Sequence, residues 1–250
     1  MVVDLVNILS ELKAQKWIEL TQVVSSEIPY FPAFKPLEEE TLFTVEADGF
    51  FAKNYQLVSQ YGTHIDPPVH FSALPVYVAD LPLKDLFLPL IVLHLEDAVA
   101  QNHDYVVTVE DILAHEAQYG IIPAKSFVAF SSGWSERWEQ HEQFYNQDEQ
   151  GQGHTPGWSL AALKFLHEER QVQAIGHETL DTDAAVDATK HHDLIGERYW
   201  LSQGNYQVEV LKNLRQIPAT GSLIAIGVPK IANAPGFTVR AFAIVPSIRE

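Results

Sequence analysis

The stretch Gln60-Tyr61-Gly62-Thr63-His64-Ile65-Asp66-Pro67-Pro68-Val69-His70-Phe71 places two histidines, a carboxylate and a carboxamide within twelve residues. Residues two apart in an extended chain point to the same side, so His64 and Asp66 face one point, with Gln60 on that side as well. Pro67 favours extended backbone at Asp66, because the α conformation clashes with a following proline. Imidazole and carboxylate together suit Zn²⁺, Mn²⁺ or Fe²⁺. The stretch therefore predicts a metal site, and the alternative is a proline-rich loop with incidental histidines.

The segment Gly62-Thr63-His64-x-Asp66-x-Pro68-x-His70-Phe71 resembles the signature of the metal-dependent cyclase family, to which bacterial kynurenine formamidases and isatin hydrolases belong. That signature reads His-x-Gly-Thr-His-x-Asp-x-Pro-x-His-Phe, and seven of its eight specified positions are matched here. The exception is Gln60, which stands where the family has histidine. Such a match is much more specific than an isolated short motif.

The resemblance implies roles for further residues. His64 and Asp66 are expected to ligate the metal, and His70 to act as general base or proton shuttle, which suits an imidazole near neutral pH. The family completes its metal site with a distal histidine and, twelve residues later, a glutamate in a strand. Glu209 in Gln207-Val208-Glu209-Val210-Leu211 matches that glutamate, whereas Glu197 stands where the histidine is expected. A glutamate between apolar strand residues otherwise points to solvent.

Two readings of the replaced histidines compete. Gln60 and Glu197 both offer oxygen donors, so the site is either rebuilt with harder ligands, which favours Mn²⁺ or a similar octahedral ion over Zn²⁺, or it is dismantled. We favour the rebuilt site, because random loss would not leave a potential ligand at both positions. A shift in loop length would alternatively bring His191 or His192 to the distal position.

Three residues are candidates for substrate contact. His177 follows a predicted strand in Ile175-Gly176-His177, a common position for site residues. Trp134 ends another strand and is expected to stack on a planar substrate, with packing in the core as the alternative. Phe31 lies in the turn 29–32 and is expected to wall a pocket or simply to pack. Asp181 and Asp183 follow His177. We expect them either to line the pocket or to cap a following turn.

Composition narrows the classes of partner. The 250 residues carry 33 acidic and 16 basic side chains, so the net charge is −17, which argues against nucleic acid and anionic membrane surfaces as partners.

The sequence contains no cysteine, so disulfides and thiolate metal sites are excluded. No apolar run is long enough to span a membrane. Helical spacing with interrupting acids over residues 1–15 does not fit a signal peptide. We expect a cytoplasmic protein.

The pattern of apolar residues predicts more strands than helices. Short apolar runs are typical of strands covered on both faces. Strands are predicted at 17–24, 42–47, 55–59, 90–95, 126–131, 172–175, 206–211, 222–228 and 237–245. Helices are predicted from Thr108 to Gly120 and, capped by Ser159, over 160–169. The strand–helix–strand order over 126–175 suggests a crossover unit, and the polar stretch 136–153 a solvated loop or frayed helix.

These observations predict one α/β domain, mixed and rich in β structure, over residues 1–250. The resemblance implies the swivelling β/β/α fold and a homo-oligomer. We expect a metal-dependent hydrolase of an amide, formamide, lactam or ester bond in a small aromatic molecule, with a metal-activated water and His70 as general base. The alternatives are a catalytically silent binding protein on the same fold and a metal-dependent lyase or cyclase.

Overall fold

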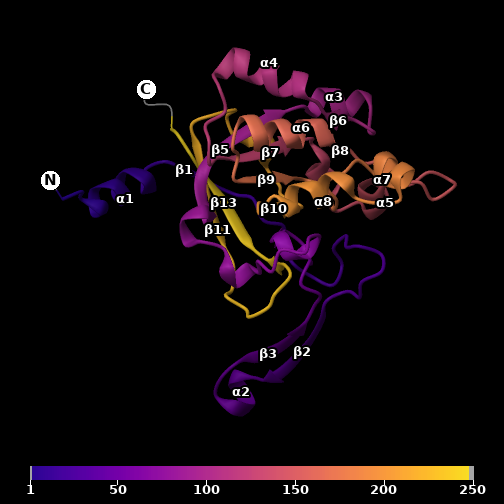
Figure 1. Cartoon of the computed structure of the whole chain (residues 1–250). Coiled ribbons are helices and arrows are strands. Elements are labelled where there is room, and N and C mark those ends of the chain that lie inside the picture. The colour runs from indigo at the N-terminus through magenta and orange to yellow at the C-terminus, as the bar shows by residue number, and fades with distance from the viewer. Residues whose placement is uncertain (1, 248–250) are drawn as a thin grey trace.

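The computed structural model describes residues 2–247. Its centre is a mixed nine-stranded sheet with the order β1-β13-β11-β5-β7-β9-β10-β4-β12 (Figure 1). The strands of this sheet are β1 (Lys16–Glu19), β4 (His64–Asp66), β5 (Phe87–His94), β7 (Phe127–Ser131), β9 (Ala174–His177), β10 (Tyr206–Glu209), β11 (Ser222–Gly227), β12 (Phe237–Thr238) and β13 (Arg240–Val245). Two small sheets consist of β2 (Glu38–Phe43) with β3 (Ala52–Gln56), and of β6 (Val106–Val107) with β8 (Gly157–Trp158).

Helices connect these strands. The α-helices are α1 (Leu5–Lys13), α2 (Val45–Asp48), α3 (Glu96–Gln101), α4 (Val109–Tyr119), α5 (His141–Tyr145), α6 (Leu160–Lys164), α7 (Ala185–His191) and α8 (Ile195–Ser202). A π-helical turn, Phe165–Glu169, continues α6. Short 3₁₀ helices occupy Pro68–His70, Val78–Asp80, Leu83–Leu86, Trp134–Arg137 and Leu214–Gln216.

Both faces of the central strands are buried, which explains their continuous apolar runs. In β5, Ile91 and Leu93 pack with residues of α3, α4, α6 and α8 in one core cluster. Leu90 and Val92 point to the opposite face and pack with residues of β1, β11 and β13. The sheet therefore curls, so that its strands from both ends enclose the second core, while the helices cover the first face.

Strand β4 lies between β10 and β12 and pairs antiparallel with both, whereas β9 and β10 are parallel neighbours. Ile65 of β4 and Val208 of β10 belong to the core within the curled sheet. Since side chains alternate along a strand, the residues flanking Ile65 and Val208 point to the opposite face, toward the helices. The polar residues of the motif are thereby directed beneath α8.

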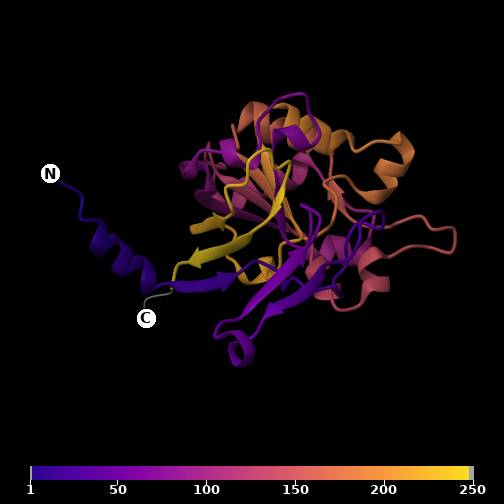
Figure 2. The same cartoon turned by 90° about the horizontal axis from the view of Figure 1, so that it is seen from below.

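Two segments stand clear of the body. The helix α1 extends from one end of the sheet and has no buried residue (Figure 2). The hairpin of β2 and β3, with α2 at its tip, projects in both views (Figures 1 and 2). We call residues 38–56 the arm. Its exposed aromatic side chains are Phe43, Phe50, Phe51 and Tyr55. A projecting surface of this kind is typical of protein–protein contacts.

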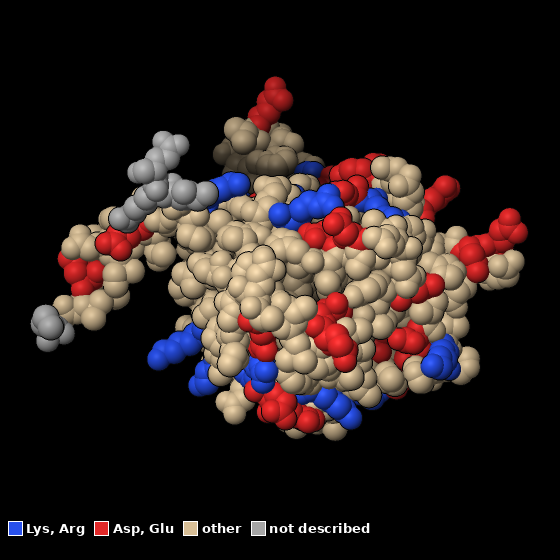
Figure 3. Space-filling view, turned by 90° about the horizontal axis from the view of Figure 1, so that it is seen from above, with Lys and Arg blue, Asp and Glu red and all other residues tan. Residues whose placement is uncertain are grey.

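On the face seen in Figure 3, acidic side chains are scattered among basic ones instead of forming one patch. Within residues 2–247, no helix has both the length and the apolar character needed to cross a membrane.

Several local predictions are confirmed. The Thr108 side chain caps α4 in a capping box with Asp111, and Gly120 ends the helix with φ of 93°. Ser159 caps the helical segment 160–169. Strands β7 and β9 are parallel neighbours joined through α6, as the predicted crossover unit requires. The polar stretch 136–153 contains only a short helix and mostly exposed residues.

Other local predictions are wrong. The strand predicted at 42–47 ends at Phe43, because the Thr44 side chain accepts a hydrogen bond from the Ala47 amide and begins α2. The strand predicted at 55–59 is β3, which ends at Gln56. The strand predicted at 237–245 is interrupted at Val239, so that β12 pairs with β4 and β13 with β1 and β11. Helices α7 and α8 were not predicted.

Candidate active site

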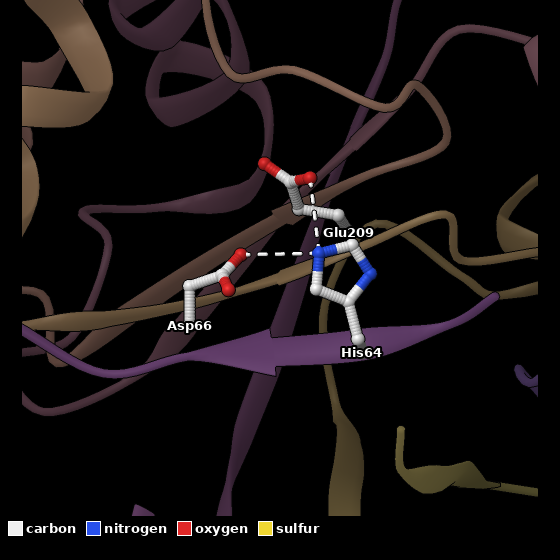
Figure 4. Close-up of side chains that lie close together, drawn as sticks. All are labelled: His64, Asp66 and Glu209. Carbon is white, nitrogen blue, oxygen red and sulfur yellow. Dashed lines mark ion pairs between the residues drawn. The ribbon is translucent and has the colours of Figure 1, made fainter. Parts of the chain in front are cut away.

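Four polar side chains share one face of the β4–β10 pair. In the antiparallel register His64 lies opposite Glu209, and Asp66 lies opposite Gln207. Paired residues and residues two apart both present their side chains on the same face. The Nε2 atom of His64 is 3.3 Å from an oxygen of Asp66 and 3.3 Å from an oxygen of Glu209 (Figure 4). All four side chains are buried.

The hydrogen bond on the far side of the His64 ring determines which atom faces the carboxylates. Its Nδ1 is 2.8 Å from the carbonyl oxygen of Gly62, which can only accept, so Nδ1 carries the proton of the neutral ring. Nε2 then directs a lone pair at Asp66 and Glu209. Burial lowers the pKa of His64, but the two carboxylates raise it well above its ordinary value. Three electron-rich atoms thus converge on a point that attracts a cation.

This arrangement fits a divalent metal ion. Neither carboxylate oxygen of the fully buried Asp66 accepts a hydrogen bond from any residue in the described range 2–247. Buried polar atoms without partners are costly unless a cation or donor satisfies them. One ligand atom from each of His64, Asp66 and Glu209 lies within 4.8 Å of the others, and a second such group consists of Asp66, His70 and Glu197. Imidazole and carboxylate donors of this kind bind Mn²⁺, Fe²⁺ and Zn²⁺.

Gly62 and Thr63 explain the backbone part of the motif. Gly62 has φ of +66°, where a side chain would be strained, and a Cβ there would lie 3.2 Å from Val24. The hydroxyl of Thr63 donates to the carbonyl of Val210 at 2.7 Å and accepts from the amide of Gln22 at 2.9 Å. These contacts tie β4 to the chain after β10, and so hold His64 opposite Glu209.

Gln207 links the carboxylates from the side. Its amide nitrogen donates to Glu197 and to Glu209, each at 2.9 Å, and its amide oxygen accepts from the Thr182 hydroxyl at 2.7 Å. The backbone amide of Glu197 donates to Asp183 at 2.9 Å, which caps the first turn of α8. Asp183 therefore has the capping role, although for a distant helix and not for the turn that follows it. The first turn of α8 thus delivers Glu197 to the site.

Of the three residues considered for the distal position, Glu197 is the one that lies beside the cluster. Glu197 is buried and its Oε1 lies 3.9 Å from Nε2 of His70. His191 and His192, at the end of α7, are exposed. Burial raises the pKa of Glu197 and the carboxylates of Glu209 and Asp66 raise it further, well above the ordinary value.

His70 and Gln60 lie on the open side of this cluster. Nε2 of His70 is 3.8 Å from Oδ1 of Asp66, and its side chain is 26% exposed, whereas that of Asp66 is fully buried. Nδ1 of His70 is 3.3 Å from the amide nitrogen of Gln60, and the amide oxygen of Gln60 accepts a hydrogen bond from Ser59. Gln60 was expected as a ligand, but its oxygen is directed to Ser59. Its contact is with the His70 ring.

A cavity of about 160 Å³ opens beside these residues. His64, His70, Glu197 and Glu209 line its polar side. Its apolar walls are Phe31, Phe34, Phe71, Leu180 and Leu194. A closed apolar cavity of about 150 Å³ accommodates one benzene ring. The space beside the cluster therefore suits a small aromatic molecule.

The three predicted substrate-contact residues have different positions. Phe31 lines the cavity. Trp134 is buried in the first core, and its indole nitrogen donates to the carbonyl of Phe144 at 2.9 Å, so its surroundings are those of a packing residue. His177 is completely buried outside the cavity lining, with Nε2 3.4 Å from Oε1 of Glu209. It contacts a carboxylate of the cluster from behind.

Three residues of the site were not predicted. Gln207 could have been found, because it is two residues from Glu209 on the same strand face. Thr182 is brought to Gln207 only by the chain between β9 and α7. Gly236 is buried and lies 170 residues after Asp66, and a Cβ there would approach the Gln60 amide and come within 2.9 Å of Oδ1 of Asp66.

Replacing Gly236 with alanine is expected to weaken metal binding and activity by about 10- to 100-fold, as for other residues that position ligands. The added methyl group meets the ends of the Gln60 and Asp66 side chains, not the backbone, so the fold is retained while both side chains shift. Metal affinity measured by titration, with Tm as the check on folding, tests this expectation. Gly227→Ala is the control, since its nearest atom would be the Arg240 carbonyl at 3.6 Å. Equal effects of the two variants would contradict the assignment.

The stability of the metal-free protein is expected to depend on pH. Burial and the charge of Glu209 raise the pKa of Asp181 to about 7. The folded chain then keeps a proton that the unfolded chain releases, so stability is present at acid pH and is lost as the pH rises from about 4 to about 7. The lowered pKa of Asp66, which burial raises but His64 lowers more strongly, acts below this window. We expect Tm in chelator to fall by about 5 °C between about pH 5.5 and 7.5.

Asp181→Asn should weaken this dependence, because asparagine does not titrate, and the slope that remains comes from Glu197, whose pKa is also raised. Asp187→Asn, an equal change of charge on α7, should leave it as in the original protein. A metal-free Tm that rises with pH in this window would show that Asp181 does not hold its proton in the folded state.

The fold and the site together define a class of protein: a mixed sheet carrying a buried His–Asp–Glu centre beside an aromatic-walled cavity. A sequence profile of the cyclase family matches residues 18–184. The chain belongs to the cyclase family.

Similar proteins agree with this assignment. An isatin hydrolase from Roseibium aggregatum is 28% identical over 207 residues, which are 80% of this chain and 78% of that protein. The structure of isatin hydrolase A from Ralstonia solanacearum matches with a TM-score of 0.91 and 28% identity over 98% of both chains. That of isatin hydrolase A from Labrenzia aggregata, bound to benzyl benzoate, matches with a TM-score of 0.90 and 27% identity over 97% of this chain and 99% of that one. The predicted family, fold class and hydrolase activity are confirmed.

Proposed function

We propose that this protein hydrolyses a carbon–nitrogen bond of an amide, formamide or lactam, or an ester bond, in a small aromatic molecule. The observation that carries the proposal is the convergence of His64, Asp66 and Glu209 beside a cavity the size of an aromatic ring. The likeness to isatin hydrolases supports the same chemistry. A lyase and a silent binding protein have no specific observation in their favour.

His64, Asp66 and Glu209 would hold the metal ion, with Glu197 as a further oxygen donor. When bound, the ion would supply the positive charge that lowers the pKa of a water molecule and polarises the scissile carbonyl. Three carboxylates against one imidazole make an oxygen-rich set, which favours Mn²⁺ over Zn²⁺. Gln207 holds two of these carboxylates in place through its donated hydrogen bonds. Gln60, in this proposal, orients His70 and is not a ligand.

His70 would act as the general base. Its Nε2 faces the carboxylate cluster at the partly exposed edge of the cavity, where a water molecule can reach it. From there it can take a proton from water and return it to the leaving group. As placed, the amide nitrogen of Gln60 donates to Nδ1, so the neutral ring carries its proton on Nε2. A half-turn of this amide would bring its oxygen to an Nδ1–H group and its nitrogen to the Ser59 hydroxyl, and Nε2 would then be free to accept a proton. The ring can therefore remain held while the proton on it moves.

The aromatic walls would hold the substrate ring. The ring centroids of Phe31 and Phe34 are 5.2 Å apart. The ring of Phe71 packs edge-on against that of His70, with 4.8 Å between their centroids. Aromatic walls bury a planar ring with little loss of side-chain entropy and exclude water from the bond under attack. A homo-oligomer and a cytoplasmic location stay predictions of the resemblance and the composition.

The test combines metal content with turnover. Protein purified without chelator is expected to contain about one Mn²⁺ or Zn²⁺ per chain, and to hydrolyse at least one of isatin, formanilide and phenyl acetate. Removing the metal should abolish this turnover, and adding Mn²⁺ should restore it. In ¹⁸O-labelled water a hydrolase places the label in the acid product, whereas a lyase does not. A folded protein that binds no divalent ion would overturn the proposal.

A further inference from the structure

Asp181 differs from the other acidic residues of the cavity in the partners of its carboxyl group. Asp66, Glu197 and Glu209 each lie within 4 Å of a histidine nitrogen. Asp181 also lines the cavity, but within the described residues its carboxylate takes part in no hydrogen bond or ion pair. It follows β9 in the loop between His177 and α7.

The surroundings of Asp181 favour a positively charged or hydrogen-donating partner. Burial and the like charges of Glu209 and Asp183 raise its pKa, and only the weaker influence of His64 opposes them. Asp181 is partly buried and has no hydrogen-bond donor from the described residues, so a ligand that supplies a donor gains a hydrogen bond there. Because Asp181 lines the cavity, a molecule in the cavity can reach it.

The remaining walls point to the same charge preference. The cavity lining also includes the apolar Leu180 and Leu194, and among the residues described no lysine or arginine lines the cavity. An anionic group on a substrate would meet carboxylates without a basic residue to receive it. A nitrogen-bound hydrogen would find a free acceptor in the carboxylate of Asp181.

We propose that Asp181 receives an N–H or ammonium group on the substrate ring, so that the enzyme selects ring compounds with a nitrogen-bound donor and rejects those with an anionic substituent. This inference rests on the proposed hydrolase function. A hydrogen bond to a charged group changes affinity by about 10- to 100-fold. Asp181 would thus determine which substituent is accepted, while His64, Asp66 and His70 act on the bond that breaks.

The test compares matched formanilides with the metal-loaded protein at pH 8, where the carboxyl group is ionised. The ring carries an aminomethyl, a methyl or a sulfonate group at position 3 or 4; sulfonate is chosen because it is a poor metal ligand. We expect kcat/KM to fall by about 10-fold or more at each step from aminomethyl to methyl to sulfonate. In Asp181→Asn the ratio between the aminomethyl and sulfonate compounds should shrink by about 10- to 100-fold. Asp187→Asn, which changes the net charge equally outside the cavity, should keep the original ratio.

Binding of benzylammonium, benzyl alcohol and benzenesulfonate, followed by ligand-observed NMR, separates recognition from turnover. Turnover without discrimination, and unchanged ratios in Asp181→Asn, would overturn the role of Asp181 and leave the hydrolase proposal standing. The expected order of binding without turnover would support the role of Asp181 and count against the hydrolase. Loss of the metal from Asp181→Asn would make Asp181 a ligand and overturn the inference.

Discussion

Replacing Asp66 with asparagine is expected to abolish tight metal binding and to reduce kcat/KM by more than about 100-fold. Residues that merely support a ligand typically contribute about 10- to 100-fold, so removing a ligand itself should cost more. Asp66 lies between His64 and His70, and it belongs to both groups of residues that could hold a metal ion. Asparagine has nearly the same shape as aspartate but no charge. A loss of metal affinity and of kcat/KM would therefore come from the missing charge and not from altered packing.

Metal content and the rise of Tm on adding Mn²⁺ measure this effect. A metal that binds only the folded state raises stability in proportion to its affinity, so the rise should disappear in the variant. Asp97→Asn, an exposed residue of α3, should show the original rise. An Asp66→Asn protein that still binds one metal ion per chain with unchanged affinity would exclude Asp66 as a ligand.

Replacing His70 with alanine is expected to lower kcat by about 10²- to 10⁴-fold while one metal ion per chain is retained. We expect kcat to fall without loss of the metal because of where His70 lies. Its Nε2 is 3.8 Å from Asp66 and 3.9 Å from Glu197, and its ring lies at the partly exposed edge of the cavity. A base at this place acts on a proton and is not needed to hold the metal. Steady-state kinetics and elemental analysis of the same preparation provide both values.

His191→Ala is the matched control for His70. It removes an exposed imidazole from the end of α7 and should leave metal content and kcat unchanged. Loss of the metal in His70→Ala would instead place His70 among the ligands, together with Asp66 and Glu197. Loss of the metal in His191→Ala would revive the distal histidine that the sequence left open.

The sequence predicts the part of the site whose arrangement depends only on local backbone geometry. His64 and Asp66 share a face because they are two residues apart before a proline, and this follows from any extended backbone. Gln60 could not be interpreted in this way, because a carboxamide offers either nitrogen or oxygen, and the choice depends on its contact with Ser59 and His70. Trp134 was ambiguous for a similar reason, since an aromatic residue at a strand end suits both a pocket and a core.

The fold was predictable where one local signal dominated. The cap at Thr108 and the glycine at 120 define α4 without reference to the rest of the chain. In contrast, the strand predicted at 42–47 gives way to α2, because Thr44 and Asp48 close a hydrogen-bonded turn within the exposed arm. Helix α8 lacks a cap of its own at Leu194 and depends on Asp183, which is thirteen residues from Gly196. Signals of that kind are invisible until the chain has folded.

The sequence by itself determined the chemistry of the metal site, because the identity and spacing of Gly62, Thr63, His64 and Asp66 dictate which groups can face one point. Only the tertiary structure decided which distant residues complete it. The register of β4 against β10 brings Glu209 opposite His64, and the cap on α8 brings Glu197 in place of His191 or His192. The reason is physical: a strand's alternation is a local property, whereas register and helix placement depend on burying both faces of the curled sheet at once.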